Sequence, residues 1–151
     1  MSVDRSYVAE NDTARARLRD LIGRLSDAEL SRPMPAGWTV AAVLAHVAFW
    51  DQRALVLLER WEQEGPEAAP AVARDTDTDW INDASKPLLL AVPPRRAADL
   101  AVAIAEAVDR KAEALADALV ARNAAAGSPV NLVRAQHRRE HLAEIERALW
   151  S

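Results

Sequence analysis

The segment 39–64 constrains the fold more than any other part of this chain. It contains neither proline nor glycine, and at 100° per residue many of its apolar residues fall on one arc. Thr39 precedes the apolar run as a candidate N-cap, and Gly65 with Pro66 follows it. The spacing predicts one long helix that is largely buried. The arc consists of Val43, His46, Val47, Trp50, Ala54, Leu57 and Trp61.

This helix also carries apolar residues outside that arc, namely Leu44, Phe49, Leu55 and Val56. A helix that is apolar on nearly every side needs more cover than one bundle core supplies. The pattern therefore indicates a subunit interface, and we expect a homodimer formed through this helix.

Three further segments show helical periodicity, at about residues 3–25, 97–122 and 132–150. Proline and glycine separate the segments, and the proline-rich stretch 66–95 contains a short predicted helix at about residues 78–85. No part of the chain shows a clear strand pattern. We predict an all-α fold in a single domain over residues 1–151. Its architecture is a four-helix bundle with a long crossover between the second and third helices.

Composition excludes several classes of function. The chain has no cysteine, so it has neither a disulfide nor a thiolate ligand of its own. The net charge of −4, with basic and acidic residues interspersed, argues against a nucleic-acid partner. The N-terminus lacks the apolar stretch of a signal peptide, and the longest mostly apolar run, 38–50, is too short to span a bilayer. We expect a cytoplasmic protein that acts on a small-molecule substrate and does not bind membranes.

The three histidines form the most informative set of side chains. His137 and His141 are one helical turn apart, and their rings project from the same side of the last helix. His46 lies in the apolar arc of the second helix. Three imidazoles that converge in a bundle can hold a divalent ion and leave positions open for water or substrate. A histidine on an apolar face is more often a hydrogen-bonded core residue than a ligand, so spacing alone leaves both interpretations open.

Residues 137–141 also match H-x-x-E-H, a metallopeptidase signature in which Glu140 would be the general base. That signature needs another ligand well downstream, whereas ten residues follow His141. Glu140 also points away from the arc that bisects the two histidines. We therefore disfavour a peptidase and keep Glu140 as a weak candidate for a catalytic base.

Four residues near the histidines are candidates for ligand binding. Arg134 and Arg138 flank the histidine arc and can either bind a carboxylate at the mouth of the site or extend into solvent. Trp50 is one turn from His46 and can wall a pocket. Asp51 can either orient a ligating histidine or form a surface or interface ion pair.

Several motifs, taken in order, resemble the DinB/YfiT-like superfamily. GWTVAAVLAHVAFWDQRAL at 37–55 is similar to its metal-binding helix, with His46, Trp50 and Asp51 at matching places. HRREHLAEI at 137–145 resembles its terminal H-x-x-x-H helix, and DWIN at 79–82 resembles its short third element. The chain departs from the family at Ala42, where many relatives have Glu, and at Leu142, where Arg is frequent.

The resemblance implies a divalent ion, zinc or nickel, held by His46, His137 and His141, commonly in a homodimer. It also implies a thiol-dependent S-transferase or isomerase, because relatives use mycothiol or bacillithiol. The absence of cysteine agrees with a thiol that is carried in by such a cofactor. Two alternatives stay open. One is a non-catalytic metal-binding, ligand-binding or sensory bundle, and the other is a metal-dependent hydrolase.

Overall fold

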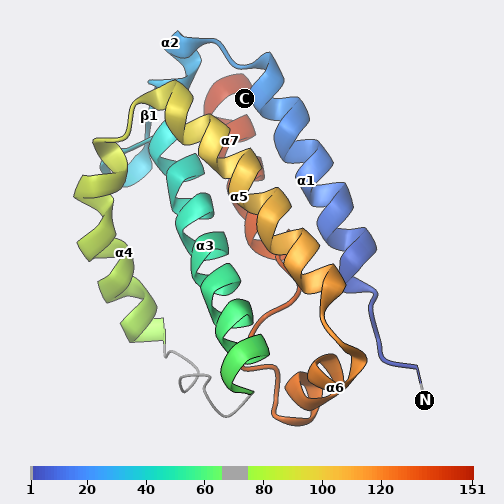
Figure 1. Cartoon of the computed structure of the whole chain (residues 1–151). Helices are drawn as coiled ribbons and strands as arrows, with labels where there is room; N and C mark the ends of the chain where they lie inside the picture. The colour runs from blue at the N-terminus through green and yellow to red at the C-terminus, as the bar shows by residue number, and fades with distance from the viewer. Residues whose placement is uncertain (1, 66–74) are drawn as a thin grey trace.

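The computed structural model describes residues 2–65 and 75–151, and its four long helices lie side by side (Figure 1). The helix α3 packs most extensively against α5, and α1 packs against both α7 and α5. This arrangement confirms the predicted all-α fold built on a four-helix bundle. The four helices are α1 (Tyr7–Arg24), α3 (Val40–Glu64), α5 (Pro94–Ala114) and α7 (Ala135–Trp150).

Further elements lie at the two ends of the bundle and along one side (Figure 1). At one end, α2 (Asp27–Leu30) leads into a small hairpin that the sequence did not predict. In it, β1 (Pro33–Met34) pairs antiparallel with β2 (Trp38–Thr39) across the 3-10 turn η1 (Pro35–Gly37). At the other end lies α6 (Asp117–Ala125), while α4 (Asp75–Leu90) runs beside α3.

The central helix α3 begins and ends where the sequence indicated. The Thr39 hydroxyl accepts a hydrogen bond from the Ala42 amide at 3.1 Å, which satisfies one free donor at the helix start. Gly65 ends the helix with a φ of 90°, which favours glycine. By length and composition α3 could cross a membrane, but 61% of its most apolar window is buried inside the bundle. Such burial is typical of the core helix of a soluble protein.

The third predicted helix, 97–122, is wrong as one element, because the chain leaves the helical conformation at Leu115 and Ala116 between α5 and α6. Leu115 is buried in the core. Arg5 donates to the Leu115 carbonyl at 2.6 Å and to the Glu113 carbonyl at 3.0 Å, and it pairs with Asp117. Arg5, which is distant in sequence, thus satisfies carbonyls at the end of α5. The high helix propensity of the alanine-rich segment gives no sign of this break.

Two other boundaries were also shifted by tertiary contacts. The last helix begins at Ala135 rather than near residue 132, because the buried Asn11 side chain of α1 binds this part of the chain. Its Oδ1 accepts from the amides of Arg134 and Ala135 at 2.8 and 3.0 Å, and its Nδ2 donates to the Leu132 carbonyl. The helix α4 is longer than predicted and continues through Pro87, while Leu89 packs on the core.

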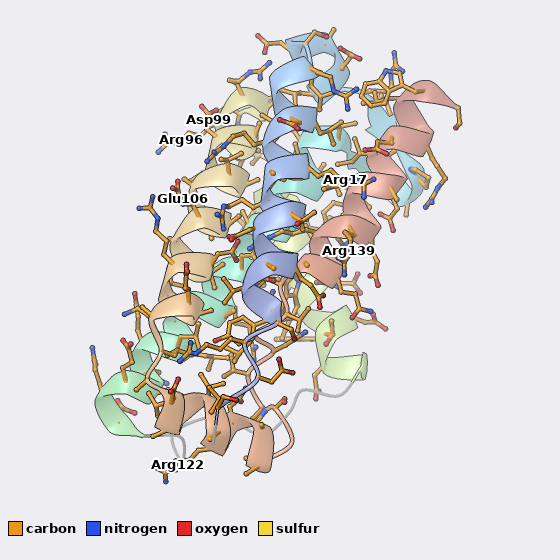
Figure 2. The ribbon with its side chains drawn as sticks, turned by 90° about the vertical axis from the view of Figure 1, so that its right-hand side faces the viewer. Arg17, Arg96, Asp99, Glu106, Arg122 and Arg139 are labelled. Atoms are coloured by element: carbon orange, nitrogen blue, oxygen red, sulfur yellow. The ribbon has the colours of Figure 1, made fainter. Side chains whose placement is uncertain are left out.

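Charged residues cover the outer faces of the helices. Figure 2 shows Arg17, Glu106 and Arg139 on the outside of α1, α5 and α7. Arg17 pairs with Glu146 at 3.0 Å, and Arg139 approaches Glu10 at 3.6 Å, so both pairs link α1 with α7. Surface pairs of this kind contribute about 0–1 kcal/mol each, so apolar burial carries most of the stability.

Candidate metal centre

The three histidines meet between α3 and α7. Nε2 of His137 lies 3.3 Å from Nε2 of His46 and 3.0 Å from Nε2 of His141. One ligating atom from each ring lies within 4.8 Å of the others. Within the part of the chain that the structure describes, the predicted candidates thus converge on one point. The antiparallel course of the bundle brings residues 91 positions apart into contact.

These separations suit ligands of a single ion. Nitrogen ligands about 2.1 Å from an ion, at angles between 90° and 109°, lie about 3.0–3.4 Å apart. Without a shared cation, Nε2 of His137 cannot donate to one ring and accept from the other, because an imidazole nitrogen carries either one proton or one lone pair. A cation that accepts all three lone pairs satisfies them together, so the donor set fits a divalent ion such as zinc or nickel.

Burial keeps the histidines in the form that binds metals. It lowers the pKa of His46 to about 4, with a further contribution from His141. Burial also lowers the pKa of His137 to about 3, and the neighbouring histidines, Arg134 and Arg138 add to that shift. Both rings are therefore neutral at pH 7, and each has a nitrogen lone pair to offer.

Glu144 orients the third histidine. Its Oε2 lies 2.9 Å from Nδ1 of His141, one turn further along α7. A proton on Nδ1 places the lone pair of His141 on Nε2, toward the other two rings. By contrast, Nδ1 of His46 and Nδ1 of His137 are buried without a hydrogen-bond partner among the described residues.

A cavity of about 390 Å³ opens beside the three rings. The cavity borders α3, α4, α7 and the segment that precedes α7. A ligand in this cavity could therefore occupy a free coordination position of an ion held by the three histidines. Trp50 lies in its wall and donates to Asn82 Oδ1 at 2.9 Å, which fixes the ring. The lining residues are His46, Trp50, Thr78, Asn82, Asn131, Arg134, His137 and His141.

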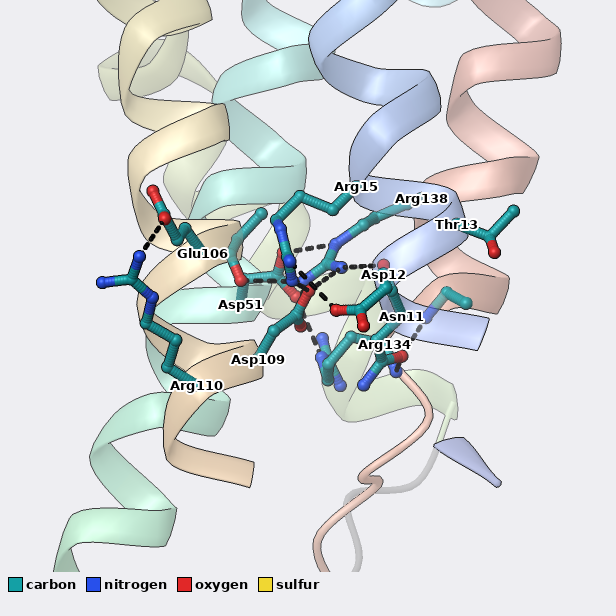
Figure 3. A network of polar contacts seen from close by, with 12 residues as sticks. Asn11, Asp12, Thr13, Arg15, Asp51, Glu106, Asp109, Arg110, Arg134 and Arg138 are labelled. Carbon is teal, nitrogen blue, oxygen red and sulfur yellow. Dashed lines mark hydrogen bonds and ion pairs between the residues drawn. The ribbon is translucent and has the colours of Figure 1, made fainter. Parts of the chain in front are cut away.

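The two arginines that the sequence singled out occupy different environments. Arg134 lines the cavity, and its Nε donates to Asp51 at 2.9 Å. Arg138 is fully buried away from the cavity, where it pairs with Asp51 at 3.0 Å and with both oxygens of Asp109 at 2.8 Å (Figure 3). Arg138 therefore neither extends into solvent nor lines the cavity as a cofactor-binding group would.

Asp51 is also fully buried, which contradicts a surface ion pair. Asp51 binds Arg134 and Arg138 and contacts no histidine among the described residues, so its role is to hold the helix α7. Arg15 adds a further pair to Asp109 at 2.6 Å, which brings α1 into the same network (Figure 3).

Glu140 lies outside the site. It is exposed, and among the described residues it accepts a hydrogen bond only from Gln136, at 3.4 Å. Glu144 belongs to the site but is not among the residues that the sequence pattern singled out. Its spacing of three from His141 is a signal that was available, because residues three apart are neighbours on a helix.

Comparison with protein families agrees with this architecture. The model of the mycothiol maleylpyruvate isomerase N-terminal domain matches residues 12–148. No curated protein and no solved structure matches the chain. The family match spans all four long helices and contains all three histidines. The chain therefore belongs to the mycothiol maleylpyruvate isomerase N-terminal domain family, within the DinB-like superfamily.

Proposed function

We propose that this protein is a metal-dependent enzyme that uses a low-molecular-weight thiol, mycothiol or a close analogue, for S-transfer to a small electrophile or for its isomerisation. The convergence of three Nε2 atoms beside a cavity carries the proposal. The matched family is named for a mycothiol-dependent isomerase, which supports the choice of thiol. The absence of cysteine agrees with a nucleophile that arrives from outside the chain.

The residues of the chain have separate roles in this proposal. His46, His137 and His141 hold a zinc or nickel ion, and Glu144 orients His141. The ion, when bound, lowers the pKa of a coordinated thiol so that an anionic sulfur is available at neutral pH. Trp50 and Asn82 form a fixed wall against which the reactants pack.

Arg134 is the cation of the cavity in this proposal. Nε of Arg134 donates to Asp51, and Nη1 of Arg134 donates to the Asn131 carbonyl at 3.4 Å. The terminal nitrogens of the guanidinium are thus weakly used by the protein and suit an anionic group of the substrate.

We further propose that the protein acts in the cytoplasm as a homodimer. We propose an interface on α4 as well as α3, because α4 covers part of α3 and itself carries exposed apolar side chains. Trp80 and Leu88 of α4 are 71% and 73% exposed and lie two turns apart on the helix. Val56 of α3 is 42% exposed.

Elemental analysis of protein purified without a histidine tag tests the metal site. We expect about one ion per chain, and loss of that ion in His46→Ala, His137→Ala and His141→Ala variants that remain folded. The activity is tested with mycothiol and two electrophiles, maleylpyruvate and monochlorobimane. Turnover that requires both thiol and metal supports the proposal. A bound ion without turnover favours a sensory bundle, and thiol-independent hydrolysis of an ester favours a hydrolase.

A further inference from the structure

A second cavity lies on the other side of the histidines, at the end of the bundle where the hairpin covers α3 and α7. Its volume is about 490 Å³, which exceeds that of the cavity beside the three rings. This volume is within the range of small-molecule sites, about 300–1,000 Å³. Its lining is mostly apolar and consists of Met34, Pro35, Trp38, Val43, Glu144, Arg147 and Ala148.

Contacts on Trp38 hold the wall of this cavity in place. The indole packs edge-on against the His46 ring, with ring centroids 5.6 Å apart. The ammonium of Lys86 lies 5.2 Å from the centroid of the Trp38 ring and also donates to the Ala36 carbonyl. The hairpin and α4 are thereby tied together at this indole. The cavity is preformed, so a ligand would not have to order its wall.

The two charged residues of the lining are not equivalent. Glu144 accepts a hydrogen bond from His141, so its carboxylate is already in use. Arg147 is exposed and makes no side-chain hydrogen bond or ion pair with any residue that the structure describes. The rim of an apolar cavity thus carries a cation that pairs with none of the described residues, which selects for a negatively charged group on the occupant.

We propose that this cavity is a second ligand site, which takes a small molecule with an apolar body and one carboxylate. The apolar body packs against Trp38, Met34 and Val43, and the carboxylate pairs with Arg147. The site does not depend on the proposed thiol chemistry, because none of its lining residues is one of the three histidines. Glu144 belongs to both environments, so an occupant would contact the residue that orients His141.

Titration calorimetry with octanoate on chelator-treated protein tests the proposal. Octanamide and octylamine serve as probes with the same apolar body and a different head group. We expect octanoate to bind more tightly than octanamide, and octylamine to bind most weakly. Arg147→Gln should weaken octanoate binding about tenfold and change octanamide binding by less than about twofold. Ala148→Phe, which fills the cavity, should abolish the binding of octanoate and of octanamide.

Arg134→Gln is the control for binding at the cavity beside the histidines, and it should leave octanoate binding unchanged. Each variant is checked by circular dichroism and by its thermal midpoint. The proposal is overturned if the wild-type protein does not bind octanoate, or if octylamine binds equally well. It is also overturned if Arg134→Gln weakens octanoate while Arg147→Gln does not. Because the metal is removed, these results are independent of the outcome of the thiol assay.

Discussion

Oε2 of Glu144 lies 2.9 Å from Nδ1 of His141, and both side chains belong to successive turns of α7. The hydrogen bond fixes the tautomer and the angle of the ring that completes the set of three. Partners of this kind typically change metal affinity by about 10–100-fold when they are removed.

We therefore expect Glu144→Ala to weaken zinc binding about 10–100-fold, as measured by competition with a chromophoric chelator. Glu144→Gln should weaken it less, because the amide oxygen can still accept from Nδ1. Glu140→Ala is the matched control, since it removes an exposed glutamate of the same helix and should leave affinity unchanged. Equal losses in the Glu140 and Glu144 variants would contradict an orienting role for Glu144.

The buried pairs of Arg138 predict a large stability effect. Arg138→Met leaves the carboxylates of Asp51 and Asp109 in the core without their main partner. Loss of one member of a buried pair costs about 3–5 kcal/mol, which urea denaturation would measure. Arg139→Met, at the next position, removes only an exposed contact and should change stability by less than about 0.5 kcal/mol. A small loss for Arg138→Met would show that the network contributes little.

The histidines predict that the metal-free protein loses stability in mild acid. Their folded pKa values, about 4 for His46 and about 3 for His137, lie below the ordinary value of 6.5. As the pH falls below 6.5, the unfolded chain takes up protons that the folded state excludes, so the free energy of unfolding falls. The slope is at most about 1.4 kcal/mol per pH unit for each histidine. The loss continues until the pH passes through the folded pKa values.

Urea denaturation at several pH values between 7 and 4 would measure this slope. A variant with His46→Gln and His137→Gln should show a flatter dependence over the same range. If the wild-type and variant proteins have the same slope, the two histidines do not carry the effect.

The hairpin turn predicts a gain in stability from one substitution. Ala36 has φ 60° and ψ 25°, a left-handed conformation that is unfavourable for residues with a Cβ atom. Ala36→Gly should raise stability by about 0.5–1 kcal/mol, because relief of this strain exceeds the entropy that glycine adds to the unfolded chain. The same change at Ala16, an exposed position inside α1, should lower stability by about 1 kcal/mol. Thermal denaturation of both variants would test the predicted difference in sign.

The exposed apolar face of α4 is the proposed dimer contact. Trp80→Lys combined with Leu88→Lys should convert a homodimer into a monomer in sedimentation velocity. The helical content should remain unchanged, because both side chains are more than two thirds exposed. A wild-type protein that sediments as a monomer at all concentrations tested would contradict the proposed dimer.

The sequence pattern predicts a helix boundary correctly where residues next to that boundary in the sequence determine it. The start of α3 follows from the Thr39 cap and its end from Gly65, and both lie within the segment itself. The positions of His46, His137 and His141 on core-facing arcs also follow from helical spacing. Their approach to about 3 Å is a property of the bundle that no single segment contains.

Contacts between distant segments account for the features that the sequence did not reveal. The break at Leu115 depends on Arg5, and the start of α7 depends on Asn11, more than 100 positions away in each case. Asp51 and Arg138 look like surface charges in a sequence, because burial of paired ions is visible only after the helices are assembled. The hairpin strands are two residues long, too short for any alternation to be detected.

His137 and Arg138 are adjacent in the chain, yet their side chains contact different partners. His137 meets His46 beside the cavity, whereas Arg138 joins α7 to Asp51 of α3 and Asp109 of α5. Different residues of α7 therefore contribute to the histidine site and attach the helix to the bundle. Divergence at the cavity walls, at positions such as Trp50 and Asn82, can alter ligand preference while this anchor preserves the spacing of the histidines.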